Sequence, residues 1–249
     1  MPFTFAHPAI ILPFAKASPK YFSITAAVIG SMTPDFEYFF RLKVYSLYSH
    51  TWAGLFYFDL PMGIAVYILF HAIVRAQLLA HLPKSLYIRF NEFNKTDVSI
   101  WRGARWPVVA LSILLGSASH LFWDGFTHRQ GYFAEQLPFL RQELVLAGNS
   151  IPVCRILQHV STVVGLSALG LAVYYLPKSS SSRSEPDKKA YWSIITIVAA
   201  IVLLGKFLIA SGITFGDFVV SVVSGLLLGV LVASMYTRSI SLSPKKSGR

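Results

Sequence analysis

The chain has 249 residues, of which 54% are hydrophobic and only 13% are charged. Soluble globular chains carry about 25% charged residues, so this composition argues against a soluble domain and for an integral membrane protein. The 22 Lys and Arg outnumber the 11 Asp and Glu, an excess that in membrane proteins orients loops and meets anionic lipid. No basic patch interleaved with aromatic residues stands out, so nucleic acid is not expected as a partner. The single cysteine, Cys154, excludes an intrachain disulfide and a Cys-rich zinc site.

The N-terminal stretch AIILPFAKAS ends in an Ala-Lys-Ala sequence that is similar to a signal-peptide cleavage site. No Lys or Arg precedes Lys16, however, and Pro8 and Pro13 interrupt the apolar run. A cleavable signal is therefore not expected, and His7 should remain in the mature protein. The next apolar stretch, YFSITAAVIGSM, is too short to cross a bilayer, and we interpret it as a short helix in or on the membrane face.

Five later segments are long and apolar enough to cross about 30 Å of hydrocarbon, which takes about 20 helical residues. They run approximately over residues 60–82, 105–122, 155–176, 191–210 and 213–236. The sequence therefore predicts an all-α protein, an integral membrane bundle with about five transmembrane helices.

The domain organisation follows from where His and the polar linker fall. All seven His lie in residues 1–176, which we take as the functional membrane domain. An exposed Ser-rich linker (177–190), a transmembrane helical hairpin (191–236) and a basic tail (237–249) follow. In the hairpin, Ser, Gly, Gly and Ala recur every four residues from 221 to 233, a pattern that favours close helix packing.

The positions of Lys and Arg predict the orientation in the membrane. Most of the Lys and Arg that flank the predicted spans lie in three stretches: residues 84–105, the 177–190 linker and the C-terminal tail. If the five spans cross the membrane alternately, all three stretches lie on one side. The positive-inside rule assigns that side to the cytoplasm of a multi-pass inner or plasma membrane protein. The N-terminal region and the loop from Asp124 to Cys154 then lie on the extracytoplasmic side, although Lys16, Lys20, Arg41 and Lys43 count against this orientation.

The stretch SHLFWDGFTHRQG (119–131) closes one apolar segment with possible metal ligands. His120 and Asp124 are four residues apart, so on a helix they project from one face. His128 extends this stripe if the helix continues past Gly125. Taken alone, a His–x3–Asp pair is more often a hydrogen-bonded structural feature than a metal site.

Three other motifs in the same part of the chain add ligand types. TFAHPA contains His7, GSMTPDFEYF contains Asp35, and LYSHTWAG contains His50. In apolar surroundings an isolated carboxylate or imidazolium is costly, and a bound cation removes that cost. Nitrogen and carboxylate ligands without thiolate suit zinc, with Mn²⁺ or Fe²⁺ as lesser options.

Together with the opening MPFTFAHPA and the FDLPMG segment, these motifs resemble a family of bacterial integral membrane proteins classed as a domain of unknown function. That family begins with Met-Pro-Phe-Thr-x-Ala-His-Pro, and the resemblance covers most of the chain. More distantly, the order of motifs is similar to membrane-bound metal-dependent hydrolases of the LexA-binding inner-membrane type. Both look similar to zinc-dependent phospholipase C and related nucleases, whose His and Asp ligands hold up to three zinc ions.

The resemblance to phospholipase C implies a set of ligands in this chain. Six of its ligand positions are matched by His7, Asp35, His50, His120, Asp124 and His128. The last motif of the pattern, His–x3–Glu, is matched only by His159, because Val163 stands where the carboxylate belongs. One or two ions are therefore expected rather than three. Glu37, Thr127 and Gln158 are candidates for orienting the ligands.

The function implied is a zinc-dependent hydrolase of a phosphoester in a membrane lipid or a cell-envelope substrate. Metal ions can activate water and stabilise the leaving oxygen, and Asp35 is the candidate catalytic residue, either as a bridging ligand or by orienting the water. The alternatives are a non-enzymatic membrane scaffold with a structural metal site and a small-ion transporter. Polar residues are scarce in the spans and dense in the His/Asp motifs, which favours the hydrolase.

Overall fold

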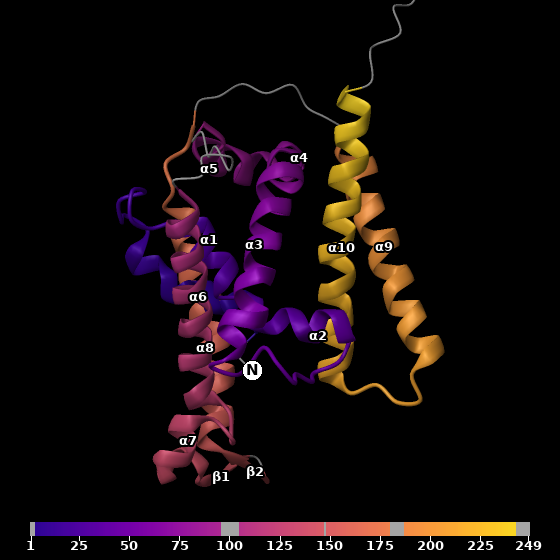
Figure 1. Cartoon of the computed structure of the whole chain (residues 1–249). Helices are drawn as coiled ribbons and strands as arrows, with labels where there is room; N and C mark the ends of the chain where they lie inside the picture. The colour runs from indigo at the N-terminus through magenta and orange to yellow at the C-terminus, as the bar shows by residue number, and fades with distance from the viewer. Residues whose placement is uncertain (1–2, 96–104, 147, 180–186, 243–249) are drawn as a thin grey trace, which may run out of the picture. The chain divides into compact units, whose positions relative to one another are not determined.

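The computed structural model describes residues 3–95, 105–146, 148–179 and 187–242 (Figure 1). Parts of the predicted linker and basic tail, residues 180–186 and 243–249, lie outside the described residues, as do residues 96–104. The chain divides into two compact units, which are described separately. Unit 1 comprises Met1–Phe36, Ser46–Tyr67 and Arg102–Tyr175, and unit 2 comprises Glu37–Tyr45, Ile68–Trp101 and Leu176–Arg249.

Unit 1 is built around two long helices, α6 and α8, which lie side by side (Figure 1). Its helical elements in chain order are the 3-10 helix η1 (Thr4–Phe14), α1 (Ile24–Gly30), the 3-10 turn η2 (Thr33–Asp35), the π-helical turn η3 (Leu55–Asp59), α3 (Leu60–Leu69), which continues into unit 2, α6 (Trp106–Thr127), α7 (Tyr132–Gln136), the 3-10 turn η6 (Pro138–Arg141) and α8 (Val153–Tyr174). Helix α1 packs on α6, and η1 packs on α8.

Unit 2 contains the C-terminal hairpin and the end of the first long helical run. Its elements are α2 (Phe36–Arg41), the π-helical turn η4 (Phe70–Val74), α4 (Arg75–His81), α5 (Lys84–Lys95), α9 (Lys188–Ile209) and α10 (Phe215–Leu242). The predicted short helix and the predicted hairpin are therefore present as α1 in unit 1 and as α9–α10 in unit 2.

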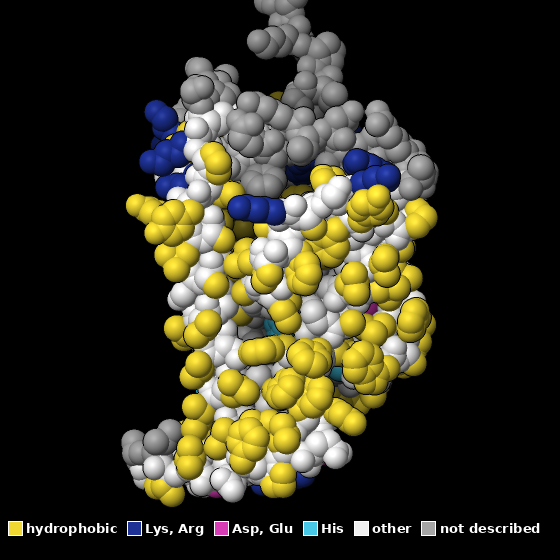
Figure 2. Space-filling view, turned by 90° about the vertical axis from the view of Figure 1, so that its left-hand side faces the viewer, with side chains coloured by type: hydrophobic (Ala, Val, Ile, Leu, Met, Phe, Trp, Pro, Cys, Tyr) yellow, Lys and Arg dark blue, Asp and Glu magenta, His cyan; other side chains and the backbone are white. Residues whose placement is uncertain are grey.

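The prediction of about five membrane spans is confirmed. Among the described residues, five helical segments are long and apolar enough to cross a membrane, namely Leu55–His81, Trp106–Gln136, Val153–Tyr174, Lys188–Ile209 and Phe215–Ile240. Their surfaces also fit a lipid environment, since α8 exposes Val163 by 65% and α9 exposes Ile209 by 89%. Hydrophobic side chains cover most of the face shown in Figure 2. The chain is a mostly helical, multi-pass membrane protein.

One short segment departs from the all-α prediction. Residues Glu143–Leu146 (β1) and Asn149–Pro152 (β2) form a two-stranded antiparallel hairpin in which Leu144 pairs with Ile151. Gly148 at the turn has φ +80°, a conformation that glycine adopts without steric cost. The all-α expectation is wrong here because a β-hairpin with a short turn requires only two short strands and a glycine in the turn.

Close contact between α1 and α6 positions the polar centre of unit 1. A Cβ atom on Gly116 would lie 2.2 Å from the carbonyl oxygen of Ala27, and one on Gly30 would lie 2.2 Å from that of Ile113. Only glycine permits this approach, as in other tightly packed membrane helices. Across the contact, Ser117 donates a hydrogen bond of 3.0 Å to the carbonyl of Gly30.

The hairpin of unit 2 uses the predicted face of small residues. A Cβ on Gly229 would lie 2.8 Å from the carbonyl oxygen of Ile195, and the Tyr191 and Ser234 hydroxyls hydrogen-bond across the two helices at 3.0 Å. The Asp217 carboxylate accepts a hydrogen bond of 2.9 Å from the backbone N–H of Val44. The buried polar groups of the hairpin are thus held by the protein itself.

Candidate metal centre

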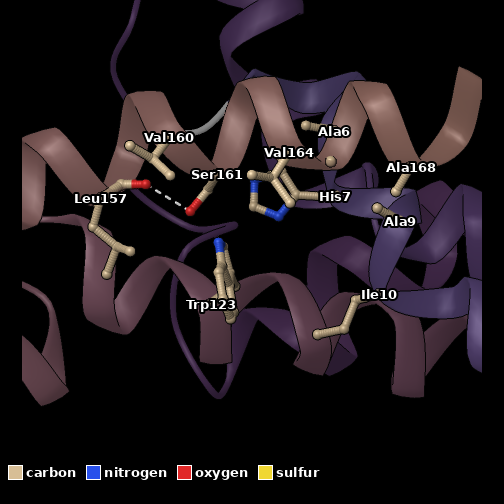
Figure 3. Close-up of a pocket in the computed structure, with 11 residues that line it drawn as sticks. Ala6, His7, Ala9, Ile10, Trp123, Leu157, Val160, Ser161, Val164 and Ala168 are labelled. Atoms are coloured by element: carbon tan, nitrogen blue, oxygen red, sulfur yellow. Dashed lines mark hydrogen bonds between the residues drawn. The ribbon is translucent and has the colours of Figure 1, made fainter.

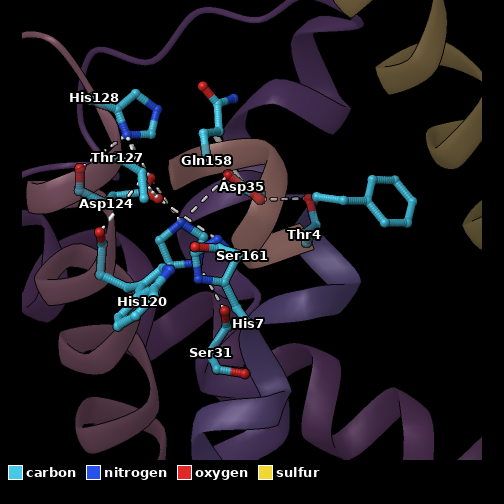
Figure 4. Close-up of polar contacts among 12 residues, drawn as sticks. Thr4, His7, Ser31, Asp35, His120, Asp124, Thr127, His128, Gln158 and Ser161 are labelled. Atoms are coloured by element: carbon cyan, nitrogen blue, oxygen red, sulfur yellow. Dashed lines mark hydrogen bonds and ion pairs between the residues drawn. The ribbon is translucent and has the colours of Figure 1, made fainter. Parts of the chain in front are cut away.

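Five of the predicted ligands meet inside unit 1 although they come from four separate segments. His7 lies on η1, Asp35 ends η2, His50 precedes η3, and His120 and Asp124 lie one turn apart on α6. Asp35 and His120 are fully buried, and His7 and Asp124 are 5% and 6% exposed. We call these five side chains the His/Asp cluster (Figure 4).

The ligand atoms of the cluster face one another at short and similar distances. His120 Nε2 lies 3.6 Å from Asp35 Oδ1 and 3.4 Å from Asp124 Oδ2. His50 Nε2 lies 3.4 Å from Asp35 Oδ1 and 3.7 Å from Asp124 Oδ2. His7 Nε2 lies 3.7 Å from Asp124 Oδ1. Two overlapping groups, His7–Asp35–His120 and His50–His120–Asp124, each bring three ligand atoms within 4.8 Å of one another.

Four of these atoms are buried and form no hydrogen bond, although each lies 3.4–3.7 Å from an ion-pair partner in the cluster. His7 Nε2, Asp35 Oδ1, His120 Nε2 and Asp124 Oδ2 have no hydrogen-bond partner among the described residues. Leaving one such atom unsatisfied costs about 1–3 kcal/mol, and more when the group is charged. Two imidazole nitrogens and two carboxylate oxygens that lie close together without hydrogen bonds are a set of atoms that a bound cation could satisfy.

The distances fit tetrahedral coordination by a small cation. Zinc binds His nitrogen and carboxylate oxygen at about 2.0–2.2 Å, which in a tetrahedron separates the ligand atoms by about 3.3–3.6 Å. The separations in the cluster run from 3.4 to 3.7 Å. Calcium and magnesium prefer all-oxygen sites, so the imidazoles favour zinc or another transition metal.

Hydrogen bonds behind the cluster fix the orientation of its members. His120 Nδ1 lies 2.8 Å from the carbonyl oxygen of Ser31; a carbonyl can only accept, so Nδ1 donates this hydrogen bond, and Nε2 faces the carboxylates of Asp35 and Asp124. Thr4 donates a 2.5 Å hydrogen bond to Asp35 Oδ2, which leaves Oδ1 to face the imidazoles. His50 Nδ1 lies 2.9 Å from the hydroxyl of Ser49.

Thr4 is a functional candidate that the motif analysis missed. It stands three residues before His7, and on a 3-10 helix side chains three apart lie directly above one another. Thr4 and His7 are both buried on the inner edge of η1. The sequence TFAHP could have indicated the role of Thr4. The proline after His7 disfavours a regular α-helix, so residues three apart would be expected to share a face.

The protonation states outside the membrane spans also suit metal binding. Burial lowers the pKa of His7 to about 3, assisted by His120, on which its ring stacks with 3.7 Å between centroids. Burial would raise the pKa of Asp35, but the imidazoles of His120 and His50 outweigh it and lower that pKa. A neutral imidazole and an ionised carboxylate are the ligand forms that a divalent cation requires.

Of the other two predicted ligands, His128 lies at the edge of the cluster, with its Nδ1 3.6 Å from Asp124 Oδ2, and His159 is not among the grouped ligands. Helix α6 continues through Gly125 and ends at Thr127, so that His128 is an extended C-cap residue. Its Nδ1 donates to the backbone carbonyl of Asp124 at 3.0 Å. His159 is exposed on α8 and lines a separate surface hollow with Arg155. Their roles as ligands stay predictions.

The three predicted orienting residues differ in their surroundings. Thr127 is buried, and its hydroxyl lies 3.5 Å from Asp124 Oδ1 and 3.5 Å from the carbonyl oxygen of Trp123. The Glu37 carboxylate accepts hydrogen bonds from Arg41 Nε and Nη2 at 3.0 and 2.8 Å. Gln158 is half-buried on α8 (Figure 4).

The profile of one protein family, described as "Domain of unknown function (DUF4184)", matches residues 1–235. The chain belongs to this family. The match includes every residue of the His/Asp cluster and reaches into α10, which confirms the predicted resemblance to a family of unknown function. No curated protein and no solved structure matches the chain. The resemblance to metal-dependent hydrolases rests on the motifs alone.

Proposed function

We propose that this protein is a membrane-embedded, zinc-dependent hydrolase of a phosphoester in a lipid or cell-envelope substrate. The observation that carries the proposal is the convergence of four buried ligand atoms that form no hydrogen bond in the His/Asp cluster. A purely structural polar network would be hydrogen-bonded internally. The similarity of the motifs to those of zinc-dependent phospholipase C supports the choice of reaction, as an analogy.

In this proposal the five cluster residues hold one or two zinc ions, with Mn²⁺ or Fe²⁺ as other options. Bound metal would supply an activated water and neutralise negative charge on a phosphoryl group. Thr4 fixes one oxygen of Asp35, so that the other is held toward His50 and His120 at 3.4 and 3.6 Å. A carboxylate fixed in this way can bridge metal ions or orient a water molecule.

Access to the cluster lies on the side of His50 and His128. Their side chains are 18% and 34% exposed, whereas those of Asp35 and His120 are fully buried. A hydrolase needs an open side to its metal, while a structural site is closed on all sides. The deep burial of Asp35 and His120 alone would favour a metal-stabilised scaffold. The exposure of His50 instead favours the hydrolase.

The test is hydrolysis by the zinc-loaded full chain in lipid nanodiscs, screened with a nitrophenyl phosphodiester and with phospholipids. Asp35→Asn should lower turnover by about 10³-fold while protein abundance and folding are unchanged. Asp187→Asn is the matched control, because Asp187 is an exposed N-cap of α9 and asparagine caps equally well. Full activity in Asp35→Asn would remove the catalytic role, and no hydrolysis by the parent would favour the scaffold.

We also propose that the C-terminus is cytoplasmic and the cluster extracytoplasmic, in the inner or plasma membrane. The support is the distribution of Lys and Arg in the loops. A reporter fused after Arg249 should be cytoplasmic, and one inserted at Gly148 should be on the other side. A cytoplasmic reporter at Gly148 would overturn the orientation but not the metal centre.

A further inference from the structure

An apolar groove of about 440 Å³ lies beside the His/Asp cluster in unit 1 (Figure 3). Its walls come from η1, α6 and α8, and its volume falls within the range of small-molecule sites in proteins, about 300–1,000 Å³. His7 and Trp123 line it together with residues of α8. Because α6 and α8 are both candidate membrane spans, the surroundings of the groove are hydrocarbon rather than water.

One face of α8 forms the longest wall. The residues on it are Leu157, Val160, Ser161, Val164, Gly165 and Ala168. This spacing of three and four residues marks a single helical stripe. The side chains become small toward its end, where Gly165 and Ala168 leave room. A Cβ on Gly165 would lie 2.9 Å from the carbonyl oxygen of Ala6, so η1 closes the groove there.

The length of this wall matches one leaflet of a membrane. Eleven residue steps separate Leu157 from Ala168, which gives about 16 Å along the helix axis. Half of the hydrocarbon core of a bilayer is about 15 Å thick. On α8 the wall begins one turn after the first residue, Val153, and ends six residues before the last, Tyr174, so it occupies the middle part of the helix.

The lining is suited to a hydrocarbon chain. The hydroxyl of Ser161 donates to the carbonyl oxygen of Leu157 at 2.6 Å and is thereby satisfied within its own helix. The remaining polar groups are the indole N–H of Trp123 and the ring of His7, which lies in the wall (Figure 3) and whose Nε2 faces Asp124 at 3.7 Å. A molecule in the groove therefore touches the back of a cluster residue.

We infer that this groove binds one hydrocarbon chain of a phosphate-bearing lipid whose head lies at the His/Asp cluster. The position of the head rests on the proposed function, whereas binding of the chain does not. The groove then selects substrates that carry a chain long enough to reach Ala168, and it explains why a hydrolytic centre would be built between membrane helices.

The experiment uses the full chain in phosphatidylcholine nanodiscs with a trace of phosphatidic acid that carries a photoreactive diazirine near the end of one acyl chain. After irradiation, labelled peptides are mapped by mass spectrometry. We expect labelling at the deep end of the groove, around Ile10 and Ala168, and competition by unlabelled phosphatidic acid. Ala168→Phe should fill the deep end and lower this labelling about tenfold.

Gly170→Phe is the matched control, because a Cβ at Gly170 meets nothing within 4 Å and the residue is exposed on the same helix. It should label like the parent. Ala168→Leu, a milder substitution, should give an intermediate loss if Ala168→Phe folds poorly. Equal labelling of the Ala168 and Gly170 variants, or labelling spread evenly over all helices, would overturn the inference.

Zinc content, measured on the same samples, separates this inference from the proposed function. Specific labelling at Ala168 in a protein that binds no zinc would support the groove and contradict the hydrolase. Zinc-dependent hydrolysis with labelling spread evenly over all helices would support the hydrolase and contradict the groove.

Discussion

The His/Asp cluster and the α9–α10 hairpin both carry buried polar side chains within a membrane protein. The two regions differ in whether those side chains are hydrogen-bonded. In the hairpin, Tyr191 bonds to Ser234, and Ser221 donates to the carbonyl of Asp217 at 2.7 Å. Among the described residues from 187 to 242, no buried side-chain polar atom lacks a partner.

In the cluster, four ligand atoms form no hydrogen bond, whereas the outer atoms of Asp35 and His120 are hydrogen-bonded. Ser31 and Thr4 each bind the far side of a cluster residue and leave its inner atom free. The neighbouring hydroxyl and carbonyl groups therefore orient the cluster side chains and do not hydrogen-bond to their inner atoms. The difference between the two regions is that the polar groups of the hairpin are hydrogen-bonded within the protein, whereas the cluster has ligand atoms that could hold a metal ion.

The largest expected effect concerns the glycine contacts, which occur in both regions. Gly116→Ala should force α1 and α6 apart, because the new Cβ would lie 2.2 Å from the carbonyl oxygen of Ala27. We expect destabilisation of at least about 3 kcal/mol together with loss of bound metal, since α6 carries His120 and Asp124. Gly229→Ala should loosen the hairpin and leave the metal in place.

Thermal unfolding and metal analysis of the two variants check this prediction. Gly205→Ala is the control, because a Cβ there meets nothing within 4 Å, and it should be neutral or slightly stabilising. Equal metal loss in both tightly packed glycine variants would show that the metal does not depend on the cluster region alone.

Removal of the metal should lower stability by a smaller amount. A ligand present at about 100 times its dissociation constant stabilises by about 2.7 kcal/mol, so chelation should lower Tm by about 5–10 °C. The hairpin variant Tyr191→Phe should show the same shift, whereas His120→Ala/Asp124→Ala should show none. A chelator shift that persists in the double variant would place the metal elsewhere.

Thr4→Val tests the aiming of the ligands. Valine keeps the shape of threonine but cannot donate to Asp35 Oδ2. Loss of such an orienting hydrogen bond typically weakens metal affinity 10–100-fold, which a competition titration with a zinc-binding dye would measure. Thr4→Ser, which keeps the hydroxyl, should restore most of the affinity. If Thr4→Val and Thr4→Ser bind zinc equally, Thr4 has only a packing role.

The smallest effect is expected in the hairpin. Tyr191→Phe removes the hydroxyl that bonds to Ser234 and should cost about 1 kcal/mol, with zinc content unchanged. Thermal unfolding measures the cost, and elemental analysis measures the zinc. A fall in zinc content would contradict the division between a self-sufficient hairpin and a metal-dependent cluster.

Much of the helical fold could be predicted from the sequence because the bilayer sets both the length and the polarity of a span. The β-hairpin at 143–152 was missed because its strands are only four residues long. The π-helical turns at Leu55–Asp59 and Phe70–Val74 were also invisible, since they do not alter the hydrophobic pattern.

For the candidate site, residue types and their order identified which side chains meet but not how they are aimed. His128 fits the helical stripe of His120 and Asp124, yet α6 ends one residue before it. The contribution of Ser31 comes from a backbone carbonyl, which any residue at that position carries. Such contacts depend on the approach of α1 to α6, and a single sequence does not reveal that approach.

Elemental analysis of the purified full chain tests the central claim most directly. The parent protein, incubated with zinc and freed of excess, should contain one or two equivalents. His120→Ala/Asp124→Ala should contain almost none while keeping its helical content, and His81→Ala, which changes a histidine stacked on Tyr191 in unit 2, should match the parent. Absence of metal from the parent after zinc is supplied, or equal zinc in the double variant, would contradict the claim that the His/Asp cluster is a metal centre.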